Sequence, residues 1–562
     1  MTQPSTSEVR ATTTSTRQAE VRRHGRGWLK RVDRLNVLKV AGSFTEMGEQ
    51  HGALLGDQVK NGPIPYYRRM VERLLGKQLG AASPVVAGAL QYVVGARVER
   101  ALPAFAKETA TGIARGAGLD EAAFLRGCTM PDALLWVTSR MMQLQDPGPA
   151  VAHRLALGLG CTSAVAWGSA TKDGKLYHAR NFDYHGVANW PLHATAIFHQ
   201  PDDGQRYVSV SAAGVGLGGI TAMNEAGLSL TVHQHMFTDR TRLGGTPIGV
   251  VGDIVMRKAR SLDEAESILR AHTPIGCWTY VVTDGKAKQV LCFEESPDRQ
   301  APRRTTPEDS SFSYANIYLD EVLGSTEIAL YGSYWRHNQG RHRRAGELLR
   351  ERAGSLDAAG MASILADTGD PRCRVRDSIA MALTVGSVVF RPEDGALWIG
   401  TGEAPTSRGT FLPFSLAKMD HAPDLGELRV APATDARADD AFAQYRQAYV
   451  AYVDDADPRA ARDCLERAAK LAPEQALYHS TLGLLSVELA DAERAVSAFD
   501  AAIALGHPDE ERVAAFHLWR GRAHDLAGRR DAATADYRAC AGRKADPPVH
   551  AAAKKNLKRP FD

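Results

Sequence analysis

Cys161 is the residue of this sequence whose surroundings best suit chemistry, and it lies in GLGCTSAVAWGSATKDGKLYHARNFDYHG, residues 158–186. Gly160 precedes it, and a residue without a side chain lets the backbone adopt geometries that other residues resist. Cleavage of the Gly160–Cys161 bond would leave a thiol and a free α-amine on one residue. Because these groups have reference pKa values of about 8.5 and roughly 7.7–8.0, the residue would supply a nucleophile and a general base near neutral pH.

Arg180 and Asp183 stand three residues apart at the end of the next predicted strand, KLYHARNFD. A guanidinium beside the sulfur favours the thiolate, and a carboxylate can orient an ammonium group. From these residues alone, a structural thiol at Cys161 and a routine salt bridge between Arg180 and Asp183 are the ordinary alternatives. His178 adds another alternative. It shares one face of the predicted strand with Arg180 and would allow a Cys–His pair that needs no cleavage. A half-buried strand histidine is the common role for such a residue.

Two patterns bear on cofactors. His233 and His235 share one face of a predicted strand, as two metal ligands would, but no third ligand follows at a suitable spacing. The run GVGLGG, residues 214–219, formally satisfies G-x-G-x-x-G, yet the text after it predicts a strand and a turn where a dinucleotide site needs a helix. We therefore expect no metal and no organic cofactor.

The elements that must position these residues are short strands separated by turns. Strand-like segments follow one another from residue 161 to about 316, interrupted by a helical stretch after residue 247. Residues 35–41 also predict a strand, helical text runs from about 43 to 152, a helix is expected at about 341–352, and a hairpin closes this part near residue 402. Hairpin turns on both sides of central helices favour an antiparallel α+β layer protein over a doubly wound sheet.

The last part of the chain changes to Ala-rich helical text with an internal repeat. ARDCLERAAKLAPE and AVSAFDAAIALGHP align at a shift of 34 residues, and Gly521, Ala533 and Tyr537 repeat the pattern 38 residues later. This resembles tetratricopeptide repeats, in which small residues let paired helices pack closely and stacking buries each apolar face. We expect residues 436–562 to pack on the preceding domain and to offer a surface for a protein partner or for self-association.

The composition excludes several classes of protein. Of the 562 residues 44% are hydrophobic, which excludes a wholly disordered chain. The 68 Lys and Arg against 65 Asp and Glu leave a net charge of +3, which is too small to indicate a nucleic-acid-binding protein. Seven scattered cysteines form neither a disulfide framework nor a CxxC zinc site. No secretory h-region and no run of 18 apolar residues occurs, so we expect a cytoplasmic protein without a membrane span.

The N-terminal segment differs from the rest in charge. The first 35 residues hold eight Arg or Lys against three Asp or Glu, together with many Thr and Ser. We interpret residues 1–34 as a disordered basic arm, with a membrane or RNA contact as the alternative.

Several stretches together resemble one family. C-T-S at 161–163, D-G at 173–174 and R-N-F-D at 180–183 resemble the nucleophile region of N-terminal-nucleophile hydrolases. Within them the run is most similar to the isopenicillin-N acyltransferase family, whose precursors cleave themselves before the cysteine. GSFTEMGEQHG (42–52), TAMNEAGLSLTVHQ (221–234) and SVVFRPEDGALWIGTG (387–402) resemble other signatures of that family.

The resemblance covers roughly residues 35–415 and implies a four-layer αββα sandwich. Residues 35–160, rich in helix, would form the first part of the catalytic domain, and residues 161–420 the second. A linker at 421–435 would join them to the all-α tetratricopeptide-like part at 436–562.

The resemblance also implies roles for single residues. Cys161 matches the nucleophile, Arg180 the arginine beside it, and Asp183 the carboxylate on the α-amine. Asn316, in SYANIY, matches the asparagine whose amide helps to form the oxyanion hole. Loss of one such preorganised donor typically costs about 10²–10³ in rate.

Two further assignments follow from the resemblance. Gln234 stands where the related choloylglycine hydrolases have an asparagine, so its backbone N–H is the group expected to serve the oxyanion. Arg341 or Arg344 occupies the place of the family's late arginine, and we choose Arg341.

These features together predict an autoprocessed cysteine amidohydrolase or acyltransferase. The Gly160–Cys161 bond would cleave, and Cys161 would then attack N-acyl amides or small acylated amino compounds through an acyl-enzyme. Whether water or an amine resolves that intermediate stays open, as do the acyl group and the acceptor. The alternative hypothesis is a catalytically silent hydrolase-fold scaffold whose helical repeats bind a protein partner.

Overall fold

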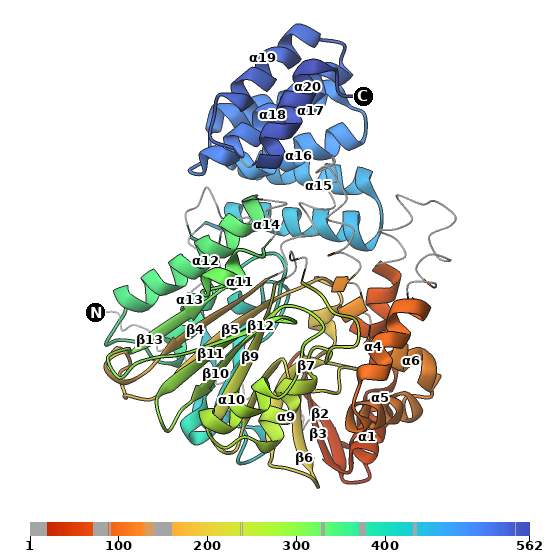
Figure 1. The fold of residues 1–562 in the computed structure, drawn as a ribbon, viewed down its shortest axis with the longest axis vertical. Coiled ribbons are helices and arrows are strands. Elements are labelled where there is room, and N and C mark those ends of the chain that lie inside the picture. The colour runs from red at the N-terminus through yellow and green to blue at the C-terminus, as the bar shows by residue number, and fades with distance from the viewer. Residues whose placement is uncertain are drawn as a thin grey trace, which may run out of the picture.

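The computed structural model describes residues 20–70, 88, 91–129, 131–133, 135–136, 139, 160–235, 238, 240–327, 332–369, 378–430, 435–545 and 547–562. Two β-sheets with helices on their outer faces form one part of the chain, and a stack of helices forms the other (Figure 1). Residues 1–19 of the predicted arm, 140–159 before the predicted cleavage site and 431–434 of the predicted linker lie outside the described residues.

The larger sheet has ten strands in the order β1-β2-β3-β6-β7-β8-β9-β10-β11-β12. Neighbouring strands pair antiparallel, except that β3 and β6 pair parallel. The strands are β1 (Arg22–His24), β2 (Gly27–Val32), β3 (Leu35–Gly42), β6 (Ala194–Pro201), β7 (Tyr207–Ala212), β8 (Thr221–Asn224), β9 (Leu228–Gln234), β10 (Trp278–Asp284), β11 (Gln289–Ser296) and β12 (Arg299–Arg304).

The smaller sheet begins with the strand that carries Cys161. Its strand order is β13-β4-β5-β14-β15-β16-β17, and β18 also pairs with β16. The strands are β4 (Gly160–Ala166), β5 (Tyr177–Asp183), β13 (Ser311–Tyr314), β14 (Thr384–Arg391), β15 (Ala396–Gly400), β16 (Thr410–Ser415), β17 (Asp420–His421) and β18 (Leu428–Arg429).

The two sheets enclose a common core. Phe198 and Met223 of the larger sheet pack there with Phe390 and Leu412 of the smaller one. Helices α1 (Phe44–Asn61), α9 (Val250–Lys258) and α10 (Leu262–Arg270) contact the larger sheet, and α12 (Gly332–Glu351) and α13 (Ala358–Leu365) contact the smaller. The predicted α+β sandwich of four layers is confirmed.

Three further helices continue from α1. α5 (Ala104–Gly116) lies directly against α1, α6 (Glu121–Cys128) packs on α5, and α4 (Ala96–Ala101) contacts α6. A Cβ at Gly52 of α1 would meet the Ile113 carbonyl oxygen of α5 at 2.1 Å, and one at Gly116 of α5 would meet the Glu49 carbonyl oxygen at 2.3 Å. Glycine is therefore required where the two backbones touch, which explains the glycines of the segment 42–52.

Three strands differ from the sequence prediction. β1 and β2 lie inside the segment interpreted as a disordered arm, because Trp28 and Val32 pack against the inter-sheet core and Leu29 is buried in the opposite direction, against the helices. The arm prediction is wrong for the part of it that these strands occupy. β12, which sequence patterning missed, is a polar strand at the edge of its sheet and contains Pro302, a residue that an edge strand tolerates because its missing N–H breaks no inner ladder.

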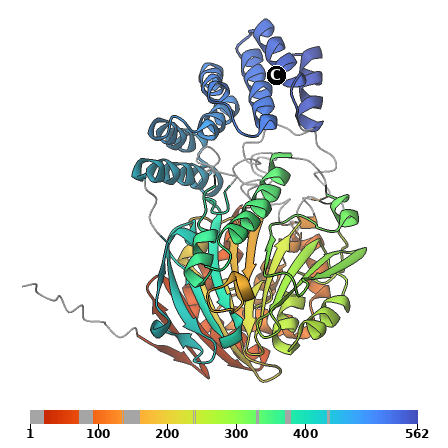
Figure 2. The same ribbon diagram turned by 90° about the vertical axis from the view of Figure 1, so that its left-hand side faces the viewer.

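The C-terminal helices form antiparallel pairs. They are α14 (Ala436–Tyr449), α15 (Pro458–Leu471), α16 (Ala476–Glu488), α17 (Ala492–Leu505), α18 (Glu510–Leu526), α19 (Arg530–Ala541) and α20 (Pro547–Lys558). Figure 2 shows them stacked on one end of the sandwich. A Cβ at Gly483 would meet the Phe499 ring at 2.7 Å, and one at Gly521 would meet the Tyr537 ring at the same distance. The sequence repeat thus has a physical counterpart, a glycine under an aromatic ring, while its tetratricopeptide class stays a prediction.

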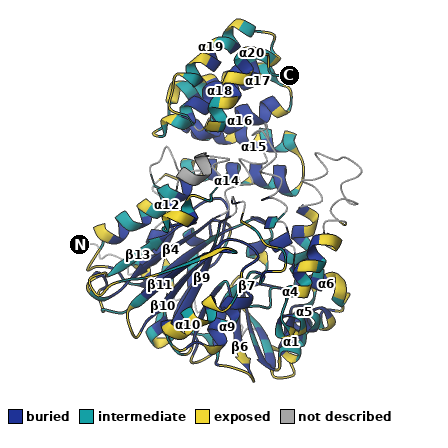
Figure 3. Cartoon of the chain, viewed as in Figure 1, coloured by how far each residue is buried: buried dark blue, intermediate teal, exposed yellow. Residues whose placement is uncertain are grey.

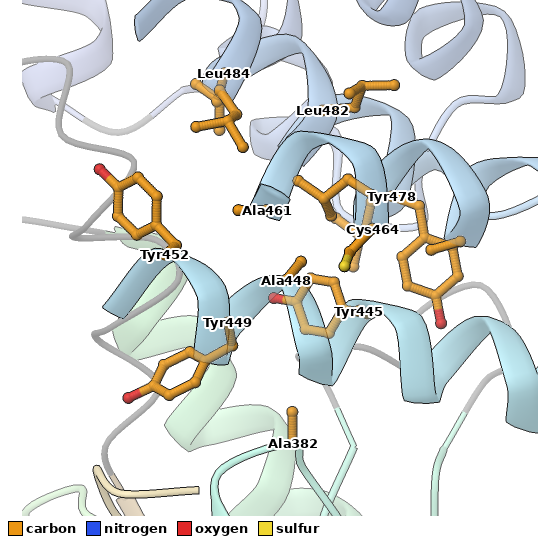
Figure 4. Close-up of a cluster of buried hydrophobic side chains, with 14 of the residues drawn as sticks. Ala382, Tyr445, Ala448, Tyr449, Tyr452, Ala461, Cys464, Tyr478, Leu482 and Leu484 are labelled. Atoms are coloured by element: carbon orange, nitrogen blue, oxygen red, sulfur yellow. The ribbon is translucent and has the colours of Figure 1, made fainter. Parts of the chain in front are cut away.

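The helical part packs on the sandwich through buried side chains. Ala382 of the sandwich lies in one apolar cluster with Tyr445, Ala448 and Tyr449 of α14 (Figure 4). The inner surfaces of these helices are buried, as the dark ribbon of Figure 3 shows. The Tyr449 hydroxyl lies 2.8 Å from His185 Nδ1. None of the helices in the described part of the chain has the length and apolarity to cross a membrane.

A pair of variants at Tyr449 tests this junction. Tyr449→Phe keeps the ring and removes the contact with His185, so the free energy of unfolding should fall by about 1 kcal/mol. Tyr449→Ala also leaves a cavity in the cluster and should cost about 3–5 kcal/mol. Urea denaturation of the full chain, followed by circular dichroism, measures both, and equal losses for the two variants would contradict a packing role.

Candidate active site

Cys161 lies at the start of β4 and lines a cleft between the two sheets. Its side chain is buried, and in the ladder it faces Phe182 of β5. The cleft holds about 610 Å³ of empty space. Its walls are mainly apolar, and its polar groups gather around Cys161; the lining residues are Pro131, Gly160, Cys161, Phe182, Asp183, Tyr184, Ile220, Val232, Gln234, Ile248, Trp278 and Asn316.

Arg180 is the cation beside the sulfur. One of its terminal nitrogens donates to Cys161 Sγ at 3.2 Å and to the Val232 carbonyl at 3.1 Å, and the other donates to the Thr221 hydroxyl. Burial raises the pKa of the Cys161 thiol, while the positive charge of Arg180 opposes that rise. In the uncleaved chain the thiol is therefore harder to ionise than a free cysteine, and Arg180 is the main group that limits the penalty.

Asp183 lies across the ladder from Gly160 and is fully buried. Its Oδ1 accepts a hydrogen bond from Thr384 at 2.5 Å, whereas its Oδ2 accepts none and lies 3.8 Å from Arg341. Burial raises the pKa of this carboxyl to about 6, and Arg341 opposes the rise. One oxygen of a buried carboxylate beside Cys161 is thus left without a donor.

Asn316 follows β13 and holds the backbone of Cys161. Its Oδ1 accepts from the Cys161 N–H at 2.5 Å, and its Nδ2 donates to the Gln234 carbonyl at 2.8 Å. The residue has φ +50°, a left-handed conformation that asparagine tolerates better than most side chains. An amide Nδ2 carries two hydrogens, so one remains for a group in the cleft.

Arg341 approaches the site from α12, which begins nine residues earlier than the sequence indicated. It is fully buried and donates to the Cys161 carbonyl at 2.7 Å and to Thr162 Oγ1 at 2.8 Å. Arg344 instead pairs with Asp367 at 3.0 Å. The structure therefore places Arg341 against β4, whereas Arg344 points away from that strand.

Arg341 lies so close to Gly160 that a side chain at position 160 would clash with it. A Cβ at this position would meet a terminal nitrogen of Arg341 at 2.4 Å. The residue before Cys161 must therefore be glycine for Arg341 to lie where it does.

Sequence reasoning missed three supporting side chains. Asn338 accepts from Arg341 at 2.7 Å and donates to the Asn316 carbonyl at 3.1 Å, while Thr384 and Thr221 bind Asp183 and Arg180. Asn338 precedes Arg341 by three residues, and that helical spacing is a signal that could have found it. The two threonines come from strands that only the tertiary fold brings near.

His178 does not bind the sulfur. Its Nδ1 lies 2.9 Å from Ser229 and its Nε2 3.4 Å from Ser163, in a polar layer between the sheets. Burial lowers its pKa to about 3, so it is neutral. His233 joins the same layer through Ser163 at 2.9 Å. The geometry disfavours the Cys–His alternative.

The remaining patterns do not make a cofactor site. In the described residues no three His, Cys, Asp or Glu side chains gather as metal ligands would. The glycine run 214–219 connects β7 with β8, a strand, so the helix that a dinucleotide site needs does not follow it.

The site lies in a four-layer αββα sandwich, two sheets with helices on their outer faces. Residues 169–404 match the family profile described as acyl-coenzyme A:6-aminopenicillanic acid acyl-transferase. The resemblance predicted from the sequence is thereby confirmed over these residues. They include Arg180, Asp183, Asn316 and Arg341, and they begin shortly after Cys161.

Individual proteins show weaker similarity. An uncharacterized protein of Archaeoglobus fulgidus is 26% identical over 335 residues, which make up 54% of this chain and 53% of that protein. The chain thus spans about half the length of this curated relative.

Two solved structures from Caenorhabditis elegans also match. An ortholog of N-acylethanolamine-hydrolyzing acid amidase shares 17% identity over 41% of this chain and 93% of its own, with a TM-score of 0.30. The N-terminal domain of stress-induced protein-1 shares 19% identity over 22% of this chain and 100% of its own, with a TM-score of 0.21.

The contact between Arg180 and the sulfur predicts a shift in thiol ionisation. Arg180→Met removes the charge that favours the thiolate, so the pKa of Cys161 should rise further. Arg180→Lys keeps the charge and should shift it less. The rate of iodoacetamide alkylation at Cys161, followed against pH by mass spectrometry, gives the midpoint, and identical profiles for wild type and Arg180→Met would rule out this role.

Proposed function

We propose that the chain is an autoprocessed cysteine amidohydrolase or acyltransferase that acts on N-acyl amides or small acylated amino compounds. One observation carries the proposal: the thiol and the backbone nitrogen of Cys161 are each held by a separate polar group, Arg180 and Asn316. A structural cysteine needs neither contact. A residue that acts as nucleophile through its sulfur and as base through its nitrogen needs both.

The processing step uses atoms that the fold has brought together. Cys161 Sγ attacks the carbonyl carbon of Gly160, the C–N bond breaks, and the thiol proton goes to the departing nitrogen. Water then hydrolyses the Gly160 thioester, which leaves a carboxylate on Gly160 and an amine on Cys161. Asn316 and Arg341 support this step because they clamp the backbone of Cys161 on both sides of its Cα, at the N–H and at the carbonyl.

The unpaired oxygen of Asp183 supports the turnover step. Once the bond is cut, the new α-ammonium of Cys161 needs an acceptor, and Asp183 Oδ2 is buried beside it with no other donor. The free amine takes the thiol proton as Sγ attacks the substrate carbonyl, and it returns the proton to the leaving amine. The second N–H of Asn316 then stabilises the oxyanion, and water or an acceptor amine releases the acyl group.

Cleavage at Cys161 can be tested directly. Intact mass spectrometry and N-terminal sequencing of purified protein should show a chain that begins Cys-Thr-Ser at residue 161. Cys161→Ala should remain one chain, because it lacks the nucleophile, and Cys161→Ser should cleave more slowly. Full turnover of an acyl amide by protein in which the Gly160–Cys161 bond is intact would overturn the proposal.

Two variants at Asn316 separate its amide from its backbone conformation. Asn316→Ala and Asn316→Gly both remove the donor, and each should lower kcat of the processed enzyme by about 10²–10³. Both variants lose the hydrogen bonds of the amide, but glycine adopts φ +50° without strain and alanine does not, so the alanine variant should lose more thermal stability than the glycine variant. Recovery of activity in Asn316→Gly would show that the conformation matters and the amide does not.

A further inference from the structure

A second cavity adjoins the Cys161 cleft. It holds about 890 Å³ of empty space, and Pro131, Ile220 and Ile248 line both spaces. Its walls come from α5, α6 and the turn between β7 and β8, and most of them are apolar, such as Leu102, Ile113, Leu125 and Val215. Transfer of a hydrocarbon chain from water into this cavity would therefore have a favourable free energy.

One wall carries a carboxyl group that has no cationic partner in the described part of the chain. Asp132 is 1% exposed, and its two oxygens accept only the Ile248 N–H, at 3.1 and 3.3 Å. Among the described residues no Lys, Arg or His forms an ion pair with it. Burial raises the pKa of this carboxyl to about 7.

A second polar group of the cavity is also incompletely satisfied. The Tyr67 hydroxyl is buried without a hydrogen bond, and Tyr67 lines the same cavity. Its ring lies 5.3 Å, edge to face, from Tyr184, which lines the Cys161 cleft. Buried polar groups in folded proteins are nearly always satisfied, so two incompletely satisfied groups on one cavity indicate a ligand.

The structural task of Asp132 does not require its charge. An asparagine would accept the Ile248 N–H equally well, whereas an ionised carboxylate in an apolar wall is costly unless a cation meets it. A cationic ligand would supply the missing charge.

In acyl transfer the amine half of the substrate leaves first, while the acyl half stays bound to the sulfur. An apolar cavity beside Cys161 suits the half that stays. We propose that the acyl group of the substrate is a hydrocarbon chain that carries a primary ammonium, and that Asp132 is the specificity-determining residue that binds this ammonium. The proposal deepens the proposed function and rests on it only where it calls the ligand an acyl group.

The test measures binding without turnover. Calorimetric titration of n-hexylammonium, with 1-hexanol as the neutral ligand, is made at about pH 8, where a carboxyl of pKa near 7 is ionised and an alkylamine is protonated. The wild type should bind the cation at least about tenfold more tightly than the alcohol. Asp132→Asn should lose that preference and bind hexanol within about twofold of the wild type, and its Tm without ligand should be no lower than that of the wild type, because the unpaired buried charge is gone.

Glu121→Gln is the matched control, because Glu121 lies on α6, pairs with Arg115 at 3.0 Å and does not line the cavity. It removes the same charge and should bind like the wild type. A preference for the cation that survives in Asp132→Asn, or an equal loss of both ligands, would overturn the proposal.

A catalytic measurement tests the cation site and the proposed function separately. The p-nitroanilides of 6-aminohexanoic and hexanoic acid should differ in kcat/KM by about tenfold in the wild type, and Asp132→Asn should abolish that difference. If the cation binds as expected and neither anilide reacts, the proposed function fails and the cation site stands. If both anilides react equally and Asp132→Asn changes neither, the cation site fails and the proposed function stands.

Discussion

The site depends on an imbalance of buried charge around one sulfur. Arg180 and Arg341 are 2% and 0% exposed, and Asp183, the carboxylate beside them, is 0% exposed. Two guanidinium groups against one carboxylate leave an excess positive charge in a place from which water is largely excluded, and such a charge is unfavourable unless an anion meets it. The thiolate of Cys161, 3.2 Å from Arg180, is the group that can supply that anion. The carbonyl, hydroxyl and amide groups that surround the two arginines hold them in place without cancelling their charge.

Most of the scaffold exists to bring distant segments to this point. β4 and β5 are consecutive strands, so Cys161, Arg180 and Asp183 meet through a hairpin ladder. Asn316 and Arg341 arrive from β13 and α12, which pack on β4 from beside and from outside the sheet. Between the sheets Ser163, His178 and His233 form a polar layer next to the apolar core. Because such hydrogen bonds are directional, that layer specifies how the two sheets face each other.

Sequence patterning predicted the parts of this arrangement that are local in the chain. The alternation of β4 and β5 was readable, and so was their hairpin, so the relation of Cys161 to Arg180 and Asp183 could be expected from the residues alone. Asn316 and Arg341 lie 155 and 180 residues from Cys161, and only the family resemblance suggested them. Thr221 and Thr384 gave no signal, because their roles depend on strand register, whereas the signal for Asn338 was its helical spacing from Arg341. The strands β1 and β2 were missed because basic residues are interspersed with Trp28, Leu29 and Val32, so no regular apolar alternation marks them in the sequence.

The glycine beneath each aromatic ring of the helical stack has an architectural consequence. The Gly483–Phe499 and Gly521–Tyr537 contacts recur in equivalent places, so successive helix pairs meet through nearly interchangeable joints. The bonds from Tyr66 to Asp454, from Arg446 to the Ala404 carbonyl and from Arg408 to Asp439 all reach the sandwich from the first helix and the turn after it. These bonds involve none of the later helix pairs, so the number of pairs at the far end can change one module at a time while these contacts with the sandwich stay the same.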